Sequence, residues 1–324
     1  KRAVTCSSGT DALLMTLMAL NVGRGDAVFT SPFTFFATAE VISLLGATPV
    51  FVDIDSRTFN IDPSQLEKKI DLVKKEKSLK PSCVIPVDLF GLPADYDSIK
   101  SVTEGNGLFV LEDAAQSFGA EYKGRKAGSL GGAAALSFFP AKPLGCYGDG
   151  GAVLTDDENL ADAMESIRVH GQSNDKYSNS RIGLNARFDT IQAAALLPKL
   201  EIFPDELEER HRVAKRYTEG LEGYVETPFA PDQFQSAWAQ YSVMSDSRNH
   251  IRAALKAGGA PTAVYYSTPL HLQKAFSSLG HRKGDFPVAE SVADKIFSLP
   301  MGPYLTGDQQ DKIIHIIKRS VKGK

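Results

Sequence analysis

Lys142 is the residue whose surroundings point most clearly to chemistry. It follows an apolar and aromatic stretch at 135–139, and its other neighbours are apolar or small. Surface lysines seldom have such neighbours. An amine removed from water has a lowered pKa, so it can attack a carbonyl carbon and form a Schiff base. Four glycines within 145–151 suit a backbone packed closely beside a ligand. The alternative is an ordinary loop lysine whose stem is buried and whose amine reaches water.

Two acidic residues stand at the end of an apolar run in a second segment. Four apolar residues at 108–111 precede Glu112 and Asp113. Ligands of an α/β sheet bind at the carboxyl ends of its strands, so an acid placed there can pair with a cationic nitrogen of a ligand. The alternative is that Asp113 only caps the helix that follows.

A third segment, at 6–13, has the composition of an anion site. Small hydroxyl residues and a glycine precede a helix pattern, and they include Ser8, Gly9 and Thr10. The free N–H groups at a helix N-terminus, a glycine that allows close approach and a hydroxyl together bind phosphate well. The alternative is an ordinary N-cap at Ser8 or Thr10.

A fourth segment, 181–189, places Asn185 and Arg187 just before a helix pattern and indicates little by itself. The other three segments together supply a phosphate cradle, an acid for a pyridine nitrogen and a desolvated lysine. These are the parts that a pyridoxal-phosphate enzyme needs. The acid keeps the ring nitrogen protonated, the ring accepts electrons, and the lysine holds the cofactor and moves protons. The combination predicts pyridoxal phosphate as the cofactor.

Apolar runs of strand length alternate with helix patterns through the first part of the chain. We expect strands at 27–30, 49–52, 83–87 and 108–111, and helices at 34–45 and 64–70. Continuous apolar strands separated by helices favour a mostly parallel sheet that is covered on both faces. The sequence therefore predicts the α/β class.

A different pattern begins near residue 186. Asp189 and Gln192 have the spacing of a capping box, and apolar residues after them indicate a helix that Pro198 should disturb or end. A charged helix is expected at 205–217.

Beyond residue 223 we expect two short strands, at 240–244 and 262–266, and two further helices. This pattern favours a small C-terminal α+β domain. The expected division is a large domain over 1–204 and a small domain over 205–324, which includes the connecting helix.

The composition excludes several classes of protein. Of 324 residues 43% are apolar, which is enough for a large core and argues against disorder. Thirty-six basic and 39 acidic residues give a net charge of −3, which argues against binding nucleic acid or an anionic membrane through bulk charge. The chain has only three cysteines, too few for a disulfide scaffold. Its six histidines are scattered and do not have the spacing of a metal site, so no metal site is predicted. No apolar run is long enough to cross a membrane.

The sequence resembles the DegT/DnrJ/EryC1/StrS family of nucleotide-sugar aminotransferases over essentially its whole length. The motifs that show the resemblance are those at 8–13, 31–39, 46–55, 112–120, 137–145, 148–152 and 168–171. The resemblance implies the pyridoxal-phosphate fold type I of aspartate aminotransferase, with a large domain and a smaller C-terminal one. Within the family, the sequence is most similar to the branch that aminates the 3-keto position of UDP-linked N-acetylglucosamine uronates.

The resemblance implies a role for each residue of the cofactor site. Lys142 would be the Schiff-base lysine and the catalytic residue, and Asp113 would pair with the pyridine nitrogen. Gln116 would contact the ring hydroxyl, and Phe35 would stack on the ring. The residues implied at the phosphate end are Ser8, Gly9, Thr10 and Ser137, together with Asn185 from the other subunit of a homodimer.

The substrate side follows from the same resemblance. Arg187 would contact the sugar nucleotide across the dimer interface, and Tyr265 and Tyr266 would lie in the substrate site. The uronate branch has a histidine that helps to hold the sugar acid at the position of Tyr265, so this chain departs from that pattern. Lysine at 142 also argues against the dehydratases of the family, which have histidine there.

The implied activity is transfer of an amino group from L-glutamate to a UDP-linked keto-sugar for surface polysaccharide or glycan biosynthesis. Two alternatives stay open: an aminotransferase that acts at C4 of a 6-deoxy keto-sugar nucleotide, and a non-catalytic sensor domain that binds the cofactor. We expect a cytoplasmic location. Relatives have several helical turns before the phosphate-binding helix, so we also expect a natural protein longer than this chain at its N-terminus.

Overall fold

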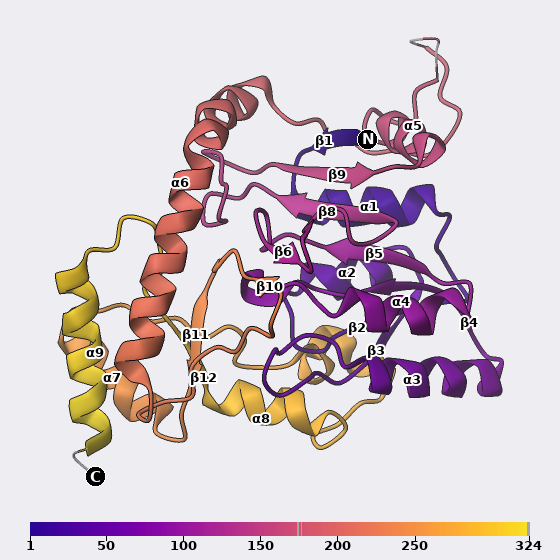
Figure 1. Ribbon diagram of the computed structural model, residues 1–324. Helices are drawn as coiled ribbons and strands as arrows, with labels where there is room; N and C mark the ends of the chain where they lie inside the picture. Colours follow the sequence, from indigo (N-terminus) through magenta and orange to yellow (C-terminus); the bar gives the residue numbers. More distant parts are fainter. Residues whose placement is uncertain (174, 176, 323–324) are drawn as a thin grey trace.

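A seven-stranded sheet organises the larger part of the molecule (Figure 1). The computed structural model describes residues 1–173, 175 and 177–322. Strand β9 is antiparallel to both of its neighbours, β1 and β8, and the other strand pairs of this sheet are parallel. In spatial order the strands are β1 (Arg2–Cys6), β9 (Gly151–Thr155), β8 (Ala133–Ser137), β5 (Phe109–Asp113), β4 (Lys80–Ile85), β2 (Asp26–Thr30) and β3 (Thr48–Phe51).

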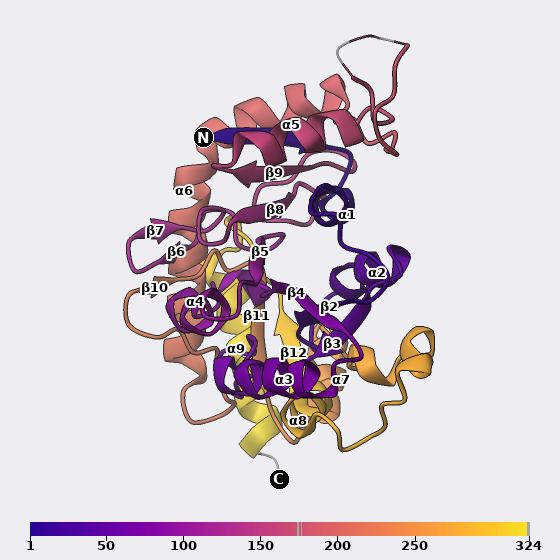
Figure 2. The same ribbon diagram turned by 90° about the vertical axis from the view of Figure 1, so that its right-hand side faces the viewer.

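Helices cover both faces of this sheet, which confirms the predicted α/β class (Figure 2). One face packs on α1 (Gly9–Ala19), α2 (Ala37–Leu44) and α5 (Glu158–Ile167), and the other on α3 (Pro63–Glu76) and α4 (Tyr96–Glu104). The inner strands are apolar on both faces because both faces are buried.

Helix α3 continues beyond its predicted end at residue 70. Val73 extends the buried stripe that Leu66 and Ile70 begin, and Lys77 then adopts a left-handed conformation with φ 57° that ends the helix. The N-terminus of α3 is capped by Asp62, whose carboxylate accepts from Ser64 N at 2.8 Å and Gln65 N at 3.4 Å.

The long helix α6 (Thr190–Leu221) runs along one side of the molecule (Figure 1). Pro198 was expected to disturb or end this helix; it does not end it, because α6 includes both Pro198 and Pro204. Each proline deprives a carbonyl one turn earlier of its N–H partner, at Ala194 and Leu200. Both of those residues are exposed, so water can bond the freed carbonyls. The predicted domain boundary after residue 204 falls inside this helix.

A smaller α+β region follows α6. Strands β11 (Tyr241–Met244) and β12 (Ile296–Leu299) pair antiparallel, and α7 (Arg248–Ala257) and α9 (Gly307–Lys322) pack against them. The strand expected at 262–266 is wrong: only Ala263 forms a bridge, with Ser298, and the chain then turns towards the large sheet. The remaining elements are β6 (Glu121–Tyr122), β7 (Arg125–Lys126), β10 (Phe234–Gln235), η1 (Leu89–Gly91), η2 (Leu270–Leu272), η3 (Lys274–Leu279) and α8 (Pro287–Lys295).

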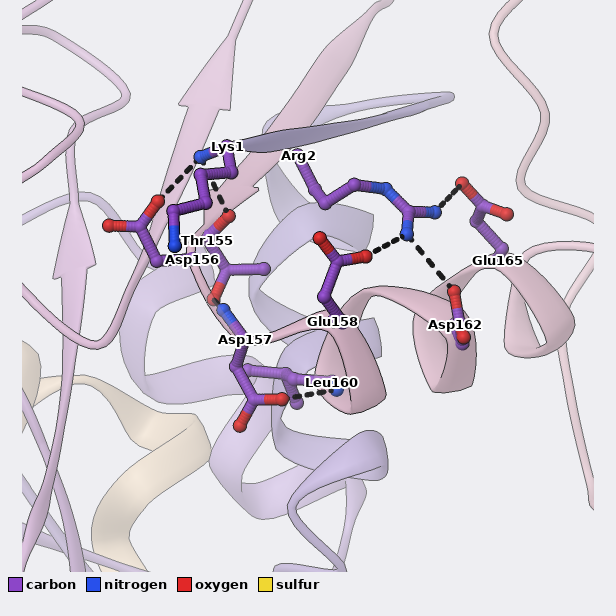
Figure 3. A network of polar contacts seen from close by, with 9 residues as sticks. All are labelled: Lys1, Arg2, Thr155, Asp156, Asp157, Glu158, Leu160, Asp162 and Glu165. Carbon is purple, nitrogen blue, oxygen red and sulfur yellow. Dashed lines mark hydrogen bonds and ion pairs between the residues drawn. The ribbon is translucent and has the colours of Figure 1, made fainter.

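An ion network fixes the edge strand β1 against α5 (Figure 3). The guanidinium of Arg2 lies 2.6 Å from Glu158, 3.2 Å from Asp162 and 2.9 Å from Glu165, three acids one helical turn apart. Glu158 and Glu165 raise the pKa of the Arg2 guanidinium. Within the described residues, no helix is both long and apolar enough to span a bilayer.

Candidate active site

A cavity of about 690 Å³ opens at the carboxyl ends of the parallel strands. Its walls come from the ends of β5 and β8, the start of α1, the segment before α2 and residues 264–273 of the smaller region. The predicted site residues that line it are Ser8, Gly9, Thr10, Phe35, Asp113, Gln116, Ser137, Lys142, Tyr265 and Tyr266. Parallel strands end on the same edge of a sheet, which is why segments far apart in sequence meet here.

Asp113 occupies the last position of β5 and is buried. Its Oδ2 accepts from the hydroxyl of Thr38 at 2.8 Å, and its Oδ1 accepts from Ala115 N at 3.2 Å. The Thr38 hydroxyl also lies 3.1 Å from that of Thr34. Burial raises the pKa of Asp113, and the charge of Lys142 opposes this rise. A cation placed beside this buried carboxyl group would stabilise its charged form.

Lys142 lies in the loop that follows β8 and is half-buried. Burial lowers the pKa of its amine, and the negative charge of Asp113 partly offsets the effect. Among the described residues, the amine of Lys142 has no hydrogen-bond or ion-pair partner. It is therefore free to react with a carbonyl group in the cavity.

Two side chains of α6 hold the loop that carries Lys142. The Nζ of Lys199 donates to the carbonyl of Gly145 at 2.6 Å, and the Oε1 of Gln192 accepts from Tyr147 N at 2.9 Å. Asp189 is the N-cap residue of α6, but its side chain makes no capping bond. The predicted capping box is thus replaced by a contact from Gln192 to the loop.

The start of α1 forms a cradle suited to a phosphate. The hydroxyl of Ser8 caps the helix by accepting from Asp11 N at 3.0 Å, so its own proton can still be donated to an anion. A Cβ at Gly9 would lie 2.7 Å from the Cβ of Ser137, and one at Gly151 would lie 2.4 Å from the carbonyl of Ser8. These glycines therefore allow the helix N-terminus to approach the end of β8.

Gln116 and Phe35 present one polar and one apolar surface to the cavity. The Oε1 of Gln116 accepts from Phe90 N at 2.7 Å, and its Nε2 donates to the hydroxyl of Tyr266 at 3.3 Å. Phe90 adopts a left-handed conformation with φ 59°, which turns its N–H towards Gln116. Phe35 is 56% exposed although it lies within a cavity, so its ring can stack on a planar ligand.

These residues fit pyridoxal phosphate. An unpaired, partly desolvated amine lies near a buried carboxylate, an anion cradle closes one end, and an exposed aromatic ring offers a stacking surface. The amine suits the aldehyde of that cofactor, the carboxylate its pyridine nitrogen, the cradle its phosphate and the aromatic side chain its ring. Which residue contacts which atom of the cofactor stays a prediction.

The lowered pKa of Lys142 predicts how apoprotein captures pyridoxal phosphate as a function of pH. Only the neutral amine attacks an aldehyde, and a lowered pKa means that the neutral form is populated at lower pH. The rate of covalent capture, followed by absorbance, should therefore reach half its maximum at a lower pH than for Nα-acetyl-lysine in solution. A midpoint equal to that of Nα-acetyl-lysine would contradict a desolvated Lys142.

Asn185 and Arg187 do not line this cavity. Both side chains are exposed, and the guanidinium of Arg187 donates to the Oδ1 of Asn185 at 2.6 Å. Their segment runs beside the end of β1, where Ser7 N donates to the carbonyl of Ala186 at 3.0 Å. The chain thus holds these two residues near the site, but neither of them lines its own cavity.

The sequence analysis missed several residues that line the cavity. Thr38 falls in a recognised motif and lies in the first turn of α2, where its hydroxyl is 3.1 Å from that of Thr34, which precedes the helix. Asp149 also lines the cavity and lies within the glycine-rich stretch at 145–151. Three further lining residues come from loops of the smaller region, where the sequence shows no period: Gln240, Thr268 and Gln273.

Comparison with known proteins places the chain among aminotransferases. The model of the DegT/DnrJ/EryC1/StrS aminotransferase family matches residues 1–318. The UDP-2-acetamido-2-deoxy-3-oxo-D-glucuronate aminotransferase of Pseudomonas aeruginosa is 48% identical, over 94% of this chain and 82% of that protein. The UDP-N-acetyl-3-dehydro-α-D-glucosamine 3-aminotransferase of Acidithiobacillus ferrooxidans is 39% identical, over 99% of this chain and 84% of its own length.

Solved structures agree with this placement. A DegT/DnrJ/EryC1/StrS aminotransferase from Brucella abortus superposes with a TM-score of 0.97 at 50% identity, covering 100% of this chain and 87% of that one. A sugar aminotransferase from Streptococcus pneumoniae, 26% identical, superposes with TM-scores of 0.91 in its PMP form and 0.90 in its PLP form. The fold expected from the resemblance, type I of the pyridoxal-phosphate enzymes, is confirmed.

Proposed function

Since the chain belongs to the DegT/DnrJ/EryC1/StrS aminotransferase family and is a pyridoxal-phosphate-dependent enzyme, we propose that it aminates the 3-keto position of a UDP-linked N-acetylhexosamine. The uronate form of that sugar is the first candidate, and L-glutamate is the proposed donor. The 48% identity to an aminotransferase of a UDP-linked 3-oxo uronate is the observation that carries this proposal.

The chain's own residues divide the work of the reaction. When bound, the cofactor supplies an electron-accepting ring that stabilises negative charge on the adjacent substrate carbon. Asp113 would keep a proton on the ring nitrogen through its buried carboxylate. Lys142 would hold the cofactor through its Nζ and, once the amino donor has displaced it, would carry the 1,3-proton shift, first as general base and then as general acid. Phe35 and Gln116 would hold the ring plane.

The charge of the cavity bears on which sugar it accepts. Among the described residues that line it, Lys142 is the single cation, and Tyr265 stands where the uronate branch has histidine. A sugar carboxylate would therefore need a cation from outside the cavity, which we propose is Arg187 of a second subunit. A sugar without a carboxylate, as in the Acidithiobacillus relative's name, would need none.

A panel of keto-sugar nucleotides tests the proposal. We expect L-glutamate-dependent amination of UDP-linked 3-keto N-acetylhexosamines, with kcat/KM at least about tenfold above that for a dTDP-linked 4-keto-6-deoxy sugar. The assay is chromatographic detection of the amino sugar and of 2-oxoglutarate. A preference for the 4-keto sugar would favour the C4 alternative. Cofactor binding without transfer to any sugar would favour a sensor domain.

We further propose that the enzyme is a homodimer whose sites share residues across the interface. Exposed apolar side chains gather on the first half of α6 and the loops beside it, which is typical of an interaction surface. They are Tyr147, Ile182, Ile191, Leu197, Leu200 and Ile202. Asn185 and Arg187 lie in the same stretch of chain, are exposed and do not line their own cavity.

Mixing two inactive variants tests this sharing. Lys142→Ala and Arg187→Ala each remove one part of every site, so each variant alone should show little amination. If Arg187 acts in the partner's site, mixed dimers contain one complete site, and random mixing should restore about a quarter of wild-type activity. Native mass spectrometry of the mixture should confirm exchange of subunits by detecting the heterodimer, whose mass lies between those of the two homodimers. Failure to restore activity despite exchange would place both residues in the site of one chain.

The amino sugar remains attached to a nucleotide, which is an activated form for glycosyl transfer. We therefore propose a role in surface polysaccharide or glycan biosynthesis, in the cytoplasm, where such nucleotides are made.

A further inference from the structure

Asp53 joins the large sheet to the smaller region through two hydrogen bonds. It stands two residues beyond the end of β3, in the 46–55 motif, and is half-buried. Its Oδ2 accepts from Val288 N at 3.0 Å, and its Oδ1 accepts from Ala289 N at 3.0 Å. Both partners lie in the first turn of α8, more than 230 positions away along the chain.

The N-terminus of α8 has no capping side chain next to it in the sequence. The helix begins at Pro287, which has no N–H, and the side chain of the N-cap residue Phe286 makes no capping bond. The next two N–H groups, those of Val288 and Ala289, would have no hydrogen-bond partner unless another segment supplied an acceptor. A carboxylate at this end also complements the helix dipole. Asp53 therefore acts as the N-cap of α8 from a different part of the fold.

Helix α8 in turn holds one wall of the substrate cavity. Its Glu290 lies 3.0 Å from the Nε2 of His271, whose side chain is fully buried. The ring of His271 packs on Phe286 with centroids 4.6 Å apart. His271 follows Leu270, which lines the cavity and whose N–H donates to the carbonyl of Pro32 at 2.7 Å.

The same wall is part of one apolar cluster with the end of β3. Phe51 packs edge-on against Phe286, with ring centroids 6.2 Å apart, and lies two residues from Asp53, on the same face of the extended chain. Tyr265 and Tyr266 pack against this cluster. A shift of α8 would therefore move the aromatic wall that faces the sugar.

We propose that Asp53 is a positioning residue that sets the cavity wall at 265–273 by capping α8. It touches neither cofactor nor substrate; it acts through α8, Glu290 and His271. The expectation for substrate kinetics rests on the proposed function, but the expectation for the mobility of the wall does not.

The test compares Asp53→Ala with Asp62→Ala. Asp62 is an equally half-buried N-cap, and it accepts two backbone N–H groups of α3, whose residues do not line the cavity. Both variants should lower the melting temperature, because both lose a cap. Only Asp53→Ala should speed backbone amide exchange at 265–273. The same variant should raise KM for the keto-sugar by about fivefold and change kcat by less than about twofold. Asp53→Asn, which keeps one acceptor, should lie between.

Two results would overturn the proposal. Equal amide exchange at 265–273 in the Asp53→Ala and wild-type proteins would show that the cap does not control the wall. A KM in Asp53→Ala no different from that in Asp62→Ala would show that Asp53 serves stability alone. If the enzyme aminated none of the keto-sugars, the exchange measurement, made on cofactor-bound protein, would still decide the structural claim.

Discussion

Replacement of Lys142 by alanine should abolish transamination and the visible absorption of lysine-bound cofactor. Removing a nucleophile that also acts as general acid and base costs about 10⁴-fold or more in rate. The cavity, the cradle at α1 and Asp113 are unchanged in this variant, so the protein should still bind pyridoxal phosphate without a covalent bond. The measurements are the absorption spectrum, borohydride reduction followed by peptide mass, and the rate of 2-oxoglutarate release.

Two control variants separate chemistry from charge. Lys142→Arg keeps a cation beside Asp113 but supplies no amine that is neutral near pH 7, so it should be as inactive as Lys142→Ala. Lys100→Ala removes an exposed lysine of α4 that pairs with Glu104, and it should leave spectrum and rate unchanged. A visible band or turnover that persists in Lys142→Ala would mean that another amine carries the cofactor.

The fold and the centre of the site follow from local patterns in the sequence. Lys142 and Asp113 each come directly after an apolar run, and parallel strands bring such positions to one edge of a sheet. The glycine next to Ser8 marks a close approach, because a side chain there would collide with Ser137. In each case, the signal lies within a few residues of the group that it predicts.

Features that depend on distant contacts could not be read in this way. Pro198 would be expected to break a helix, but α6 continues through it, and Ala194, whose carbonyl loses its N–H partner, is exposed in the single chain. The 262–266 segment has the composition of a strand, yet Tyr265 and Tyr266 turn to the cavity instead of pairing. The link from Asp53 to α8 joins segments that no local pattern relates.

Asp113→Asn should lower kcat/KM by about 10²- to 10³-fold, or about 3–4 kcal/mol, which lies in the range for breaking a buried charge pair. Asparagine has the size of aspartate, and its oxygen can still accept from the hydroxyl of Thr38. What it lacks is the negative charge that would keep a proton on the ring nitrogen of the cofactor. Affinity for pyridoxal phosphate, measured by equilibrium dialysis, should fall as well. The amine of Lys142 also loses a stabilising charge, so its pKa should fall further.

The neighbouring carboxyl, Glu112, is the matched control for this prediction. It lies on the same strand and is also buried, and burial raises the pKa of both acids. Its oxygens accept from Gly128 N at 2.6 Å and Leu130 N at 2.8 Å, so they hold a turn instead of facing the cavity. Glu112→Gln should therefore lower the melting temperature but change kcat/KM by less than about threefold. Equal losses of activity in the two variants would mean that the charge of Asp113 supports the fold and not the chemistry.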